Sequence, residues 1–246
     1  MNKNSNAYII IYSTVMVVVV AFLLAFTALS LKSRQDVNIL NEKKSAILLS
    51  LGAEDQDYDK FITAIAVDAD GNKVEEIKSE DVIKMLDDLK VTFEGEAYPI
   101  FVAKDGRVVV PVFGNGLWNI IWGYVALESD MNTISGVVLD HAGETPGLGA
   151  EIATAKHQSM YKGKKIFDDA EFVAVKLMKG GATKANIEHE VDAITGGTKT
   201  SDGVSDMLFK SLEKYVAYFN KSKSSVAAPD EDTEVVAEVE PNSENE

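Results

Sequence analysis

The residues best suited to chemistry lie together in residues 192–204, which read DAITGGTKTSDGV. Glycines and hydroxyl-bearing side chains fill a turn, and apolar residues at helical spacing follow it. We expect a helix over the second part, with Thr200 or Ser201 as its N-terminal cap. A helix N-terminus presents unpaired N–H groups and a positive dipole end, so the sequence predicts a place for a phosphate group. The alternative is an ordinary helix-capping turn without a ligand.

This segment resembles the flavinylation motif of the FMN-binding domain family, in which an aspartate precedes (Ser/Thr)-Gly-Ala-Thr. In that family the last threonine is joined to FMN through a phosphoester. The resemblance implies covalent FMN on Thr198, with Thr195 and Gly196 at the motif positions before it. It also implies that Asp192 is recognised by a flavin transferase, which attaches the cofactor.

Two residues of the segment depart from the motif or compete with it. Gly197 stands where the family has alanine, and the missing methyl group gives the backbone more freedom. Thr200, two residues beyond Thr198, is a competing attachment point. If the departure at Gly197 prevents modification, the chain is instead a cofactor-free binding domain. A stand-alone membrane-anchored flavoprotein is the other alternative.

Two further motifs extend the resemblance. Residues 114–118 read GNGLW, and residues 141–149 read HAGETPGLG. In this order they resemble the C-subunit family of the Na+-translocating NADH:quinone oxidoreductases. ETPGLG is shared with the G subunit of the related Rnf complex, so a G subunit of that complex is a further alternative. The resemblance runs from the apolar N-terminal segment to about Asn220. It implies an electron-carrying flavoprotein subunit of a translocase, which works beside other membrane and peripheral subunits.

The second of these motifs is expected to enclose the cofactor. Gly147 and Gly149 allow close approach of the backbone, whose N–H groups can face flavin carbonyls or phosphate. Leu148 can cover the flavin ring. We expect Glu144, with Thr145 beside it, to contact backbone or the ribityl chain, because a carboxylate next to a negatively charged reduced flavin is unfavourable.

Two aromatic residues of these motifs are candidates for contact with the flavin. Trp118 is the best candidate for stacking on the ring, with burial in the protein core as the alternative. His141, at the end of a predicted strand, either donates to the flavin or makes a structural hydrogen bond. In both cases the protein supplies position and electrostatics, and the cofactor supplies the chemistry.

The composition excludes several classes of site. The 246 residues contain no cysteine, which excludes disulfides, thiolate metal sites and protein-ligated iron–sulfur clusters. The three histidines lack zinc-binding spacing, and a formal net charge of −15 argues against nucleic-acid binding. No G-x-G-x-x-G motif follows a strand and no Ser–His–Asp set is found. We therefore expect neither an NADH site nor independent catalytic residues in this chain.

An apolar segment near the N-terminus predicts a membrane anchor. Residues 8–31 contain no charged side chain and are mostly aliphatic or aromatic. About 20 apolar residues in a helix cross a bilayer, so we expect a transmembrane anchor after a short N-terminal segment, residues 1–7. A cleaved signal peptide, the alternative, has a shorter apolar core of roughly 7–15 residues. The resemblance places this single-pass anchor in the bacterial inner membrane.

The sequence and the resemblance disagree about the side of the membrane on which the domain lies. Lys3 precedes the span, whereas Lys32, Arg34, Lys43 and Lys44 follow it, and the positive-inside rule would keep the large domain in the cytoplasm. The resemblance implies a periplasmic domain. We give the resemblance precedence, because the charge bias is modest and long domains translocate largely regardless of charge.

The order of elements in the remaining chain predicts an α+β domain with a mixed, mainly antiparallel sheet and packed helices. We expect residues 32–58 to form a juxtamembrane helix and linker, residues 59–222 the FMN-binding domain, and residues 223–246 a disordered acidic tail. The predicted strands are 61–67, 98–104, 107–113, 120–127, 134–140 and 172–178, with Asp105-Gly106 as a tight hairpin turn. The predicted helices are 37–51, 79–89, 149–161 and one that runs from the turn at 192–204 to about residue 219.

Overall fold

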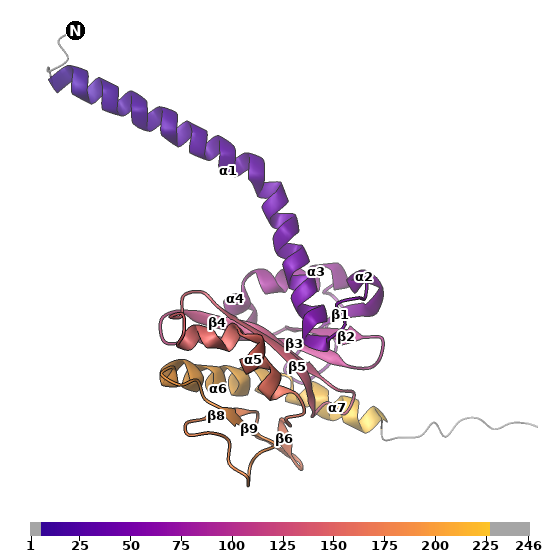
Figure 1. Cartoon of the computed structure of the whole chain (residues 1–246). Helices are drawn as coiled ribbons and strands as arrows, with labels where there is room; N and C mark the ends of the chain where they lie inside the picture. The colour runs from indigo at the N-terminus through magenta and orange to yellow at the C-terminus, as the bar shows by residue number, and fades with distance from the viewer. Residues whose placement is uncertain (1–5, 227–246) are drawn as a thin grey trace, which may run out of the picture.

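The structure, a computed structural model, describes residues 6–226. The chain forms one long N-terminal helix and a domain built on a five-stranded sheet (Figure 1). The predicted N-terminal segment 1–7 and the predicted acidic tail 223–246 lie largely outside the described residues.

The central sheet is antiparallel throughout, and its strands follow the order of the chain. Its strands are β1 (Ile62–Val67), β2 (Tyr98–Ala103), β3 (Val108–Asn115), β4 (Ile120–Leu127) and β5 (Ile134–His141). The turn between β2 and β3 contains Gly106 at φ +87°, a conformation that glycine adopts without strain. The predicted α+β class and the predicted hairpin are therefore confirmed.

Two hydrophobic cores lie on the two faces of this sheet. One face packs against α6 (Thr198–Glu213) and α7 (Val216–Val226). The other face is covered by the end of α1 (Asn6–Leu51), by α2 (Tyr58–Phe61), and by the short helices α3 (Ser79–Val82), η1 (Ile83–Asp87) and α4 (Leu89–Glu94). The helix that carries the predicted site and the N-terminal helix therefore lie on opposite sides of the sheet (Figure 1).

The N-terminal helix α1 is continuous over 46 residues, so the predicted span and the predicted juxtamembrane helix form one element. Its first part exposes apolar side chains, and it is long and apolar enough to cross a membrane. The helix bends partway along (Figure 1). The hydroxyls of Thr27 and Ser30 donate to carbonyls four residues earlier, a contact that often bends helices. The helix ends at Leu51, before Gly52 at φ +63°, where the sequence predicted that it would stop.

Three predicted elements are broken in the structure. Residues 149–161 do not form one helix, because Thr154 is extended and caps a new short helix with its side chain. Residues 79–89 are divided in the same way at Asp88, which caps α4. The predicted strand 172–178 is interrupted at Ala174, which lies at φ +55°. Between β5 and α6 the elements are η2 (Gly149–Ala153), α5 (Ala155–Gln158), η3 (Ser159–Tyr161), β6 (Phe167–Asp168), β7 (Glu171–Phe172), β8 (Lys176–Met178) and β9 (Glu190–Asp192), with β9 parallel to β8.

Candidate functional site

The helix predicted to follow the first motif begins earlier than expected. Gly197 is the N-terminal cap of α6, and not Thr200 or Ser201. The first intrahelical hydrogen bond runs from Ser201 N to Gly197 O at 2.9 Å. The N–H groups of the three residues before Ser201 therefore have no partner within the helix. Thr198, at the first helical position, is exposed.

The two hydroxyls expected to cap α6 have other partners, which explains the earlier cap. Ser201 Oγ accepts from Ile194 N at 3.0 Å. Thr200 Oγ1 donates to Glu144 Oε2 at 2.7 Å, and the side chains of Thr200 and Ser201 are buried. Thr200 is therefore held inside the domain, whereas Thr198 faces solvent.

Glu144 joins three segments of the site through one buried carboxylate. Its Oε2 accepts from Thr200, and its Oε1 accepts from the backbone N–H of Trp118 at 2.9 Å. Gly116 and Gly149 lie so close to this carboxylate that a methyl group on either would collide with it. The hydrogen bond with the backbone is a contact of the kind expected for Glu144. The residue holds together the β3–β4 hairpin, the loop after β5 and the start of α6.

The charge of Glu144 is stabilised by these hydrogen bonds. Burial alone would raise the pKa of its carboxyl, because desolvation disfavours the charged form. Hydrogen bonds from Trp118 N and from the Thr200 hydroxyl, together with weaker contributions from the backbone of Asn119 and Leu117, outweigh burial, so the pKa lies below the ordinary value of 4.5. Glu144 is therefore a carboxylate at neutral pH and acts in the site as a hydrogen-bond acceptor.

Exposed apolar side chains lie around the start of α6. Trp118 is 70% exposed and Leu148 is 42% exposed, so Trp118 is not a core residue. Leu148 lies next to Gly196, which has φ +76°, and a methyl group on Gly196 would come within 2.6 Å of Leu148 Cδ2. Together with the exposed Leu117, these two side chains form what we term the apolar wall of the site.

The other residues of the second motif shape the loop after β5. His141 Nδ1 accepts from Glu144 N at 3.3 Å, which is a structural hydrogen bond. Thr145 O accepts from Leu148 N at 3.1 Å, and Gly147, at φ +75°, completes the turn. These contacts fix the path of the loop that bears Leu148.

The first residue of the 192–204 segment, Asp192, contacts a loop outside the segment. Asp192 lies at the end of β9, and its Oδ1 accepts from Ala182 N at 2.8 Å. The side chains of Asp192 and Thr195 are not buried. Asp192 therefore ends β9, just before the turn that leads into α6, and its side chain bonds to the loop between β8 and β9.

This arrangement can hold a phosphorylated cofactor with an apolar ring. Free N–H groups at the start of α6 suit a phosphate, Thr198 offers a hydroxyl, and the apolar wall offers a surface for the ring. Among residues 6–226, no group of three or more His, Asp or Glu side chains could hold a metal ion. A cavity of about 640 Å³ lies elsewhere, between α1, α4 and the face of the sheet that α1 covers. The candidate site is therefore an open surface, not this cavity.

Comparison with known proteins identifies the family of this chain. The FMN-binding domain family matches residues 116–213, which contain Trp118, Glu144 and Thr198. The C subunit of the Na(+)-translocating NADH-quinone reductase of Vibrio anguillarum is 34% identical over 210 residues, which cover 76% of this chain and 82% of that protein. The chain belongs to this C-subunit family.

Other members of the C-subunit family agree with the assignment. The protein of Haemophilus ducreyi is 33% identical over 234 residues, which cover 85% of this chain and 90% of that protein. The crystal structure of the C subunit from Parabacteroides distasonis is 40% identical, with a TM-score of 0.67 over 77% of this chain and 96% of that chain. The resemblance and the fold expected from the sequence are confirmed.

In this member of the C-subunit family, one residue that shapes the site was not assigned from the sequence, and another, Ser201, was predicted only as a helix cap. Gly116 packs against Glu144, and its place in the GNGLW motif was the available signal. Ser201 bonds to Ile194 N, seven residues earlier, and no local pattern indicates that contact.

Proposed function

We propose that this chain is the membrane-anchored electron-carrying subunit of a Na+-pumping NADH:quinone oxidoreductase, and that it carries FMN on Thr198 through a phosphoester. One observation carries the proposal. The exposed hydroxyl of Thr198 lies at the N-terminus of α6, inside the matched FMN-binding domain. The competing hydroxyl of Thr200 is buried and bonded to Glu144. The relatives, named as the C subunit of this reductase, support the enzyme class.

The residues around Thr198 fit such a cofactor. The dipole of α6 favours a negative charge at this position by roughly 0.3–1 kcal/mol, and the free N–H groups can bond to phosphate oxygens. The apolar wall shields a ring from water, and Glu144 keeps the hairpin that bears Trp118 in place. Bound FMN supplies the electron transfer, while these residues set its position and surroundings.

Attachment of FMN requires an activated donor, for which a flavin dinucleotide is suitable. Thr198 Oγ1 would hold the cofactor through a new P–O bond to the flavin phosphate, and the bond from that phosphate to the departing nucleotide would break. The hydroxyl proton passes to solvent, and no group is oxidised or reduced. We expect a flavin transferase to catalyse this step and to recognise Asp192.

We further propose that residues 8–31 of α1 form a single-pass anchor in the bacterial inner membrane, with the domain on the periplasmic side. The length and apolar character of α1 support the anchor. An anchor beside other membrane subunits would keep the flavin at high effective concentration near its redox partners. The expected partners are therefore the other membrane and peripheral subunits of the complex.

The experiment for the attachment site uses the full-length chain coexpressed with a flavin transferase. Covalent flavin is measured by fluorescence of the denatured protein and by intact mass. Thr198→Ala should contain none, whereas Thr200→Val and the control Thr63→Ala, an exposed threonine of β1, should retain it. Flavin that persists in Thr198→Ala but disappears in Thr200→Val would assign attachment to Thr200. An unmodified wild type would refute covalent FMN.

Two further observations separate the proposal from its alternatives. Other subunits should copurify with the chain from native membranes, and their absence would favour a stand-alone anchored flavoprotein. The purified chain should not attach free FMN by itself. Self-loading would refute the need for a transferase.

A further inference from the structure

The cavity of about 640 Å³ beside α1 has the composition of a binding site. Its volume lies within the range of about 300–1,000 Å³ that is usual for ligand pockets, which are mostly apolar with a few polar groups. Its apolar lining comes from α1, α4 and three strands and includes Ile39, Ala46, Leu89, Phe113, Trp122 and Val138. The lining favours an occupant with an apolar group.

One buried polar group in this cavity has no partner. Tyr124, in β4, lines the cavity and is 5% exposed. None of residues 6–226 forms a hydrogen bond with its hydroxyl. Burial, and after it the charge of Glu42, raises the pKa of Tyr124 above its ordinary value of 10, so the hydroxyl keeps its proton and can donate as well as accept. An occupant that bonds to this hydroxyl would offset the cost of burying it.

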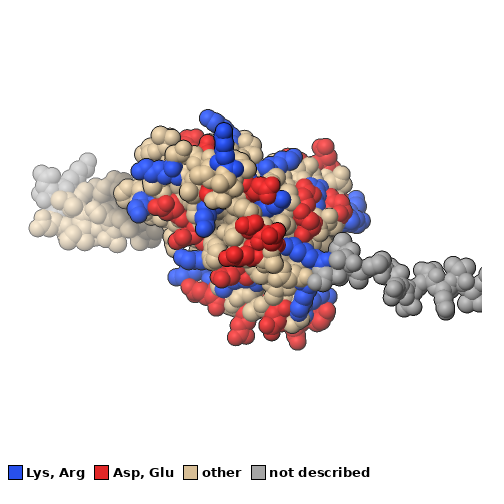
Figure 2. Space-filling view, turned by 90° about the horizontal axis from the view of Figure 1, so that it is seen from below, with Lys and Arg blue, Asp and Glu red and all other residues tan. Residues whose placement is uncertain are grey.

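Carboxylates predominate at the rim of the cavity. Its charged lining consists of four acidic residues and two lysines: Glu42, Asp87, Asp88, Asp140, Lys43 and Lys90. Lys43 is paired with Asp87, whereas Glu42 and Asp140 form no ion pair with any of residues 6–226. On the face of the domain turned away from α1, by contrast, acidic and basic side chains are interspersed without a large patch of one sign (Figure 2). The rim therefore favours a positively charged group on the occupant.

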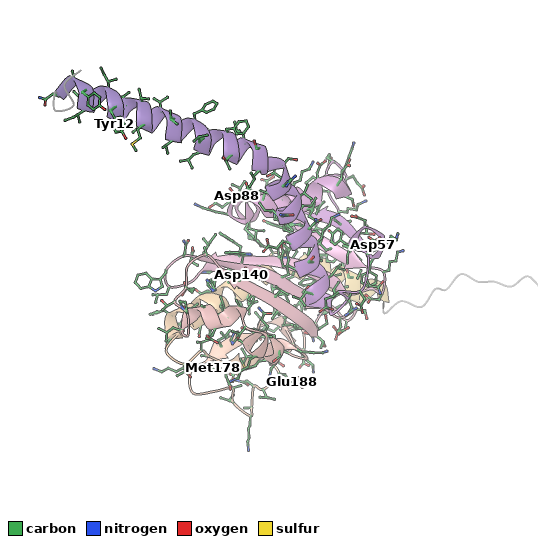
Figure 3. The ribbon with its side chains drawn as sticks, turned by 45° about the horizontal axis from the view of Figure 1, so that its top comes forward. Tyr12, Asp57, Asp88, Asp140, Met178 and Glu188 are labelled. Atoms are coloured by element: carbon green, nitrogen blue, oxygen red, sulfur yellow. The ribbon has the colours of Figure 1, made fainter. Side chains whose placement is uncertain are left out.

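The cavity lies on the part of the domain that is close to the proposed anchor. Figure 3 shows Asp88 and Asp140 nearer to α1 than Met178 and Glu188, which lie at the opposite end of the domain. Ile39 follows residue 31, the end of the proposed span, by at most about 12 Å of helix, and the headgroup layer is itself about 5–8 Å thick. A segment that protrudes from a neighbouring membrane subunit can therefore reach the cavity.

The cavity also borders the hairpin that bears the apolar wall of the candidate site. Ile120 and Trp122 of β4 line the cavity, and Ile120 lies two residues after Trp118. Trp122 pairs in register with Asp140, the residue before His141. The cavity belongs to the face of the sheet that α1 covers, and α6 packs on the other face. An occupant would therefore lie beside the candidate flavin site, with the sheet between it and α6.

We propose that this cavity is the docking site for an extramembrane segment of a neighbouring membrane subunit, which inserts an apolar side chain beside Tyr124 and places a basic residue against Glu42 and Asp140. The inference rests on the proposed function, in which the chain works beside other membrane subunits. Its relatives are named as one subunit of a reductase, and the apolar lining, the free hydroxyl and the acidic rim specify the chemistry of the segment. A phospholipid suits the cavity less, because its phosphate would meet carboxylates of the same sign.

The test places a photoreactive phenylalanine analogue at Ile39 of the full-length chain, within the assembled complex in detergent. Ile39 lines the cavity and is 48% exposed; the matched control is Ile187, which is 50% exposed and precedes Glu188 at the far end of the domain. The analogue at Ile39 should cross-link to an extramembrane segment of a membrane subunit, and mass spectrometry of the product should find a basic residue in that segment. The analogue at Ile187 should not cross-link to it.

Two changes in the same complex test the chemistry of the cavity. Tyr124→Phe removes no hydrogen bond from the isolated chain, so its melting temperature should not fall. The cross-link yield should nevertheless fall roughly two- to tenfold, the effect of one lost hydrogen bond. Glu42→Lys combined with Asp140→Lys should lower the yield by about fivefold or more, because one exposed ion pair contributes up to about that factor and the reversed charges also repel.

The control for the charge variant is Asp168→Lys combined with Glu171→Lys. These exposed residues lie in β6 and β7, away from the cavity, and the net charge changes by the same amount. The yield from Ile39 should stay at the wild-type value in this control.

Several results would overturn the proposal. A cross-link from Ile39 to a lipid or to a second copy of this chain would show a different occupant, and no cross-link would show that no segment docks. Equal yields in the charge variant and its control, or an unchanged yield in Tyr124→Phe, would show that the rim or the hydroxyl does not meet the segment. If no other subunit accompanies the chain in native membranes, the proposed function fails instead, because the test requires an assembled complex.

Discussion

The hydrogen bond between Glu144 and Thr200 can be tested by removing its donor. Thr200→Val deletes the hydroxyl and keeps the shape of the side chain, so the buried Glu144 loses one of its donors. A hydrogen bond to a charged group contributes about 1.5–3 kcal/mol, and the added methyl group offsets part of its loss. We therefore expect the free energy of unfolding to fall by about 2 kcal/mol.

The matched control is Thr198→Val, in which the same atoms change at an exposed position two residues earlier. Surface substitutions of this kind usually change stability by less than about 0.5 kcal/mol. When Glu144 is replaced by glutamine, Thr200→Val should cost at least about 1 kcal/mol less, because the charged acceptor is gone. Urea unfolding of the full-length chain in detergent measures the single and double variants. If Thr200→Val is no more destabilising than Thr198→Val, Glu144 does not join the three segments energetically.

The same contact predicts a pH dependence. The folded-state pKa of Glu144 is lowered, so its contribution to stability is present above the ordinary carboxyl value of 4.5 and is lost as the pH falls through the folded-state pKa. Below pH 4.5 the wild type should therefore lose stability more steeply than Glu144→Gln. Hydrogen exchange at Trp118 N should accelerate over the same range. Parallel stability profiles for the two proteins would contradict an ionised Glu144.

Three further outcomes are expected. Burial lowers the pKa of His157 from 6.5 to about 4, so between these values only the unfolded state takes up a proton. The stability of the folded protein should therefore fall as the pH drops from 6.5 towards 4. His157→Gln should make the melting temperature depend less on pH over this range. Gly71→Ala should lower the free energy of unfolding, measured by thermal melts, by about 2 kcal/mol or more, because a methyl group there would overlap the backbone of α7. Gly52→Ala meets no neighbouring atom and should lower it by only about 1 kcal/mol, through backbone strain. Protease added to intact spheroplasts should cleave the domain, and cleavage only after lysis would instead indicate a cytoplasmic domain.

Elements that follow local rules could be predicted from the sequence. The Asp-Gly pair at 105–106 indicated the hairpin, and Gly52 indicated the end of α1. The predicted helix 149–161 failed because the Thr154 side chain accepts from His157 N and begins a new helix. The predicted strand 172–178 failed because Ala174 adopts φ +55°, which a residue other than glycine seldom does without tertiary support. The contacts that override local preference in these places are not encoded by periodicity.

The start of α6 shows how such a contact bears on function. Local rules favour a hydroxyl as the cap, because a threonine or serine cap contributes about 1 kcal/mol. The bond from Thr200 to Glu144, which joins residues 56 positions apart, competes with that role. A hydrogen bond to a buried carboxylate contributes about 1.5–3 kcal/mol, so Thr200 turns inward and Gly197 becomes the cap. Helix α6 then begins at Thr198, whose side chain remains exposed. A tertiary hydrogen bond therefore decides which of two nearby threonines faces solvent, and with it which hydroxyl is accessible to a phosphate donor.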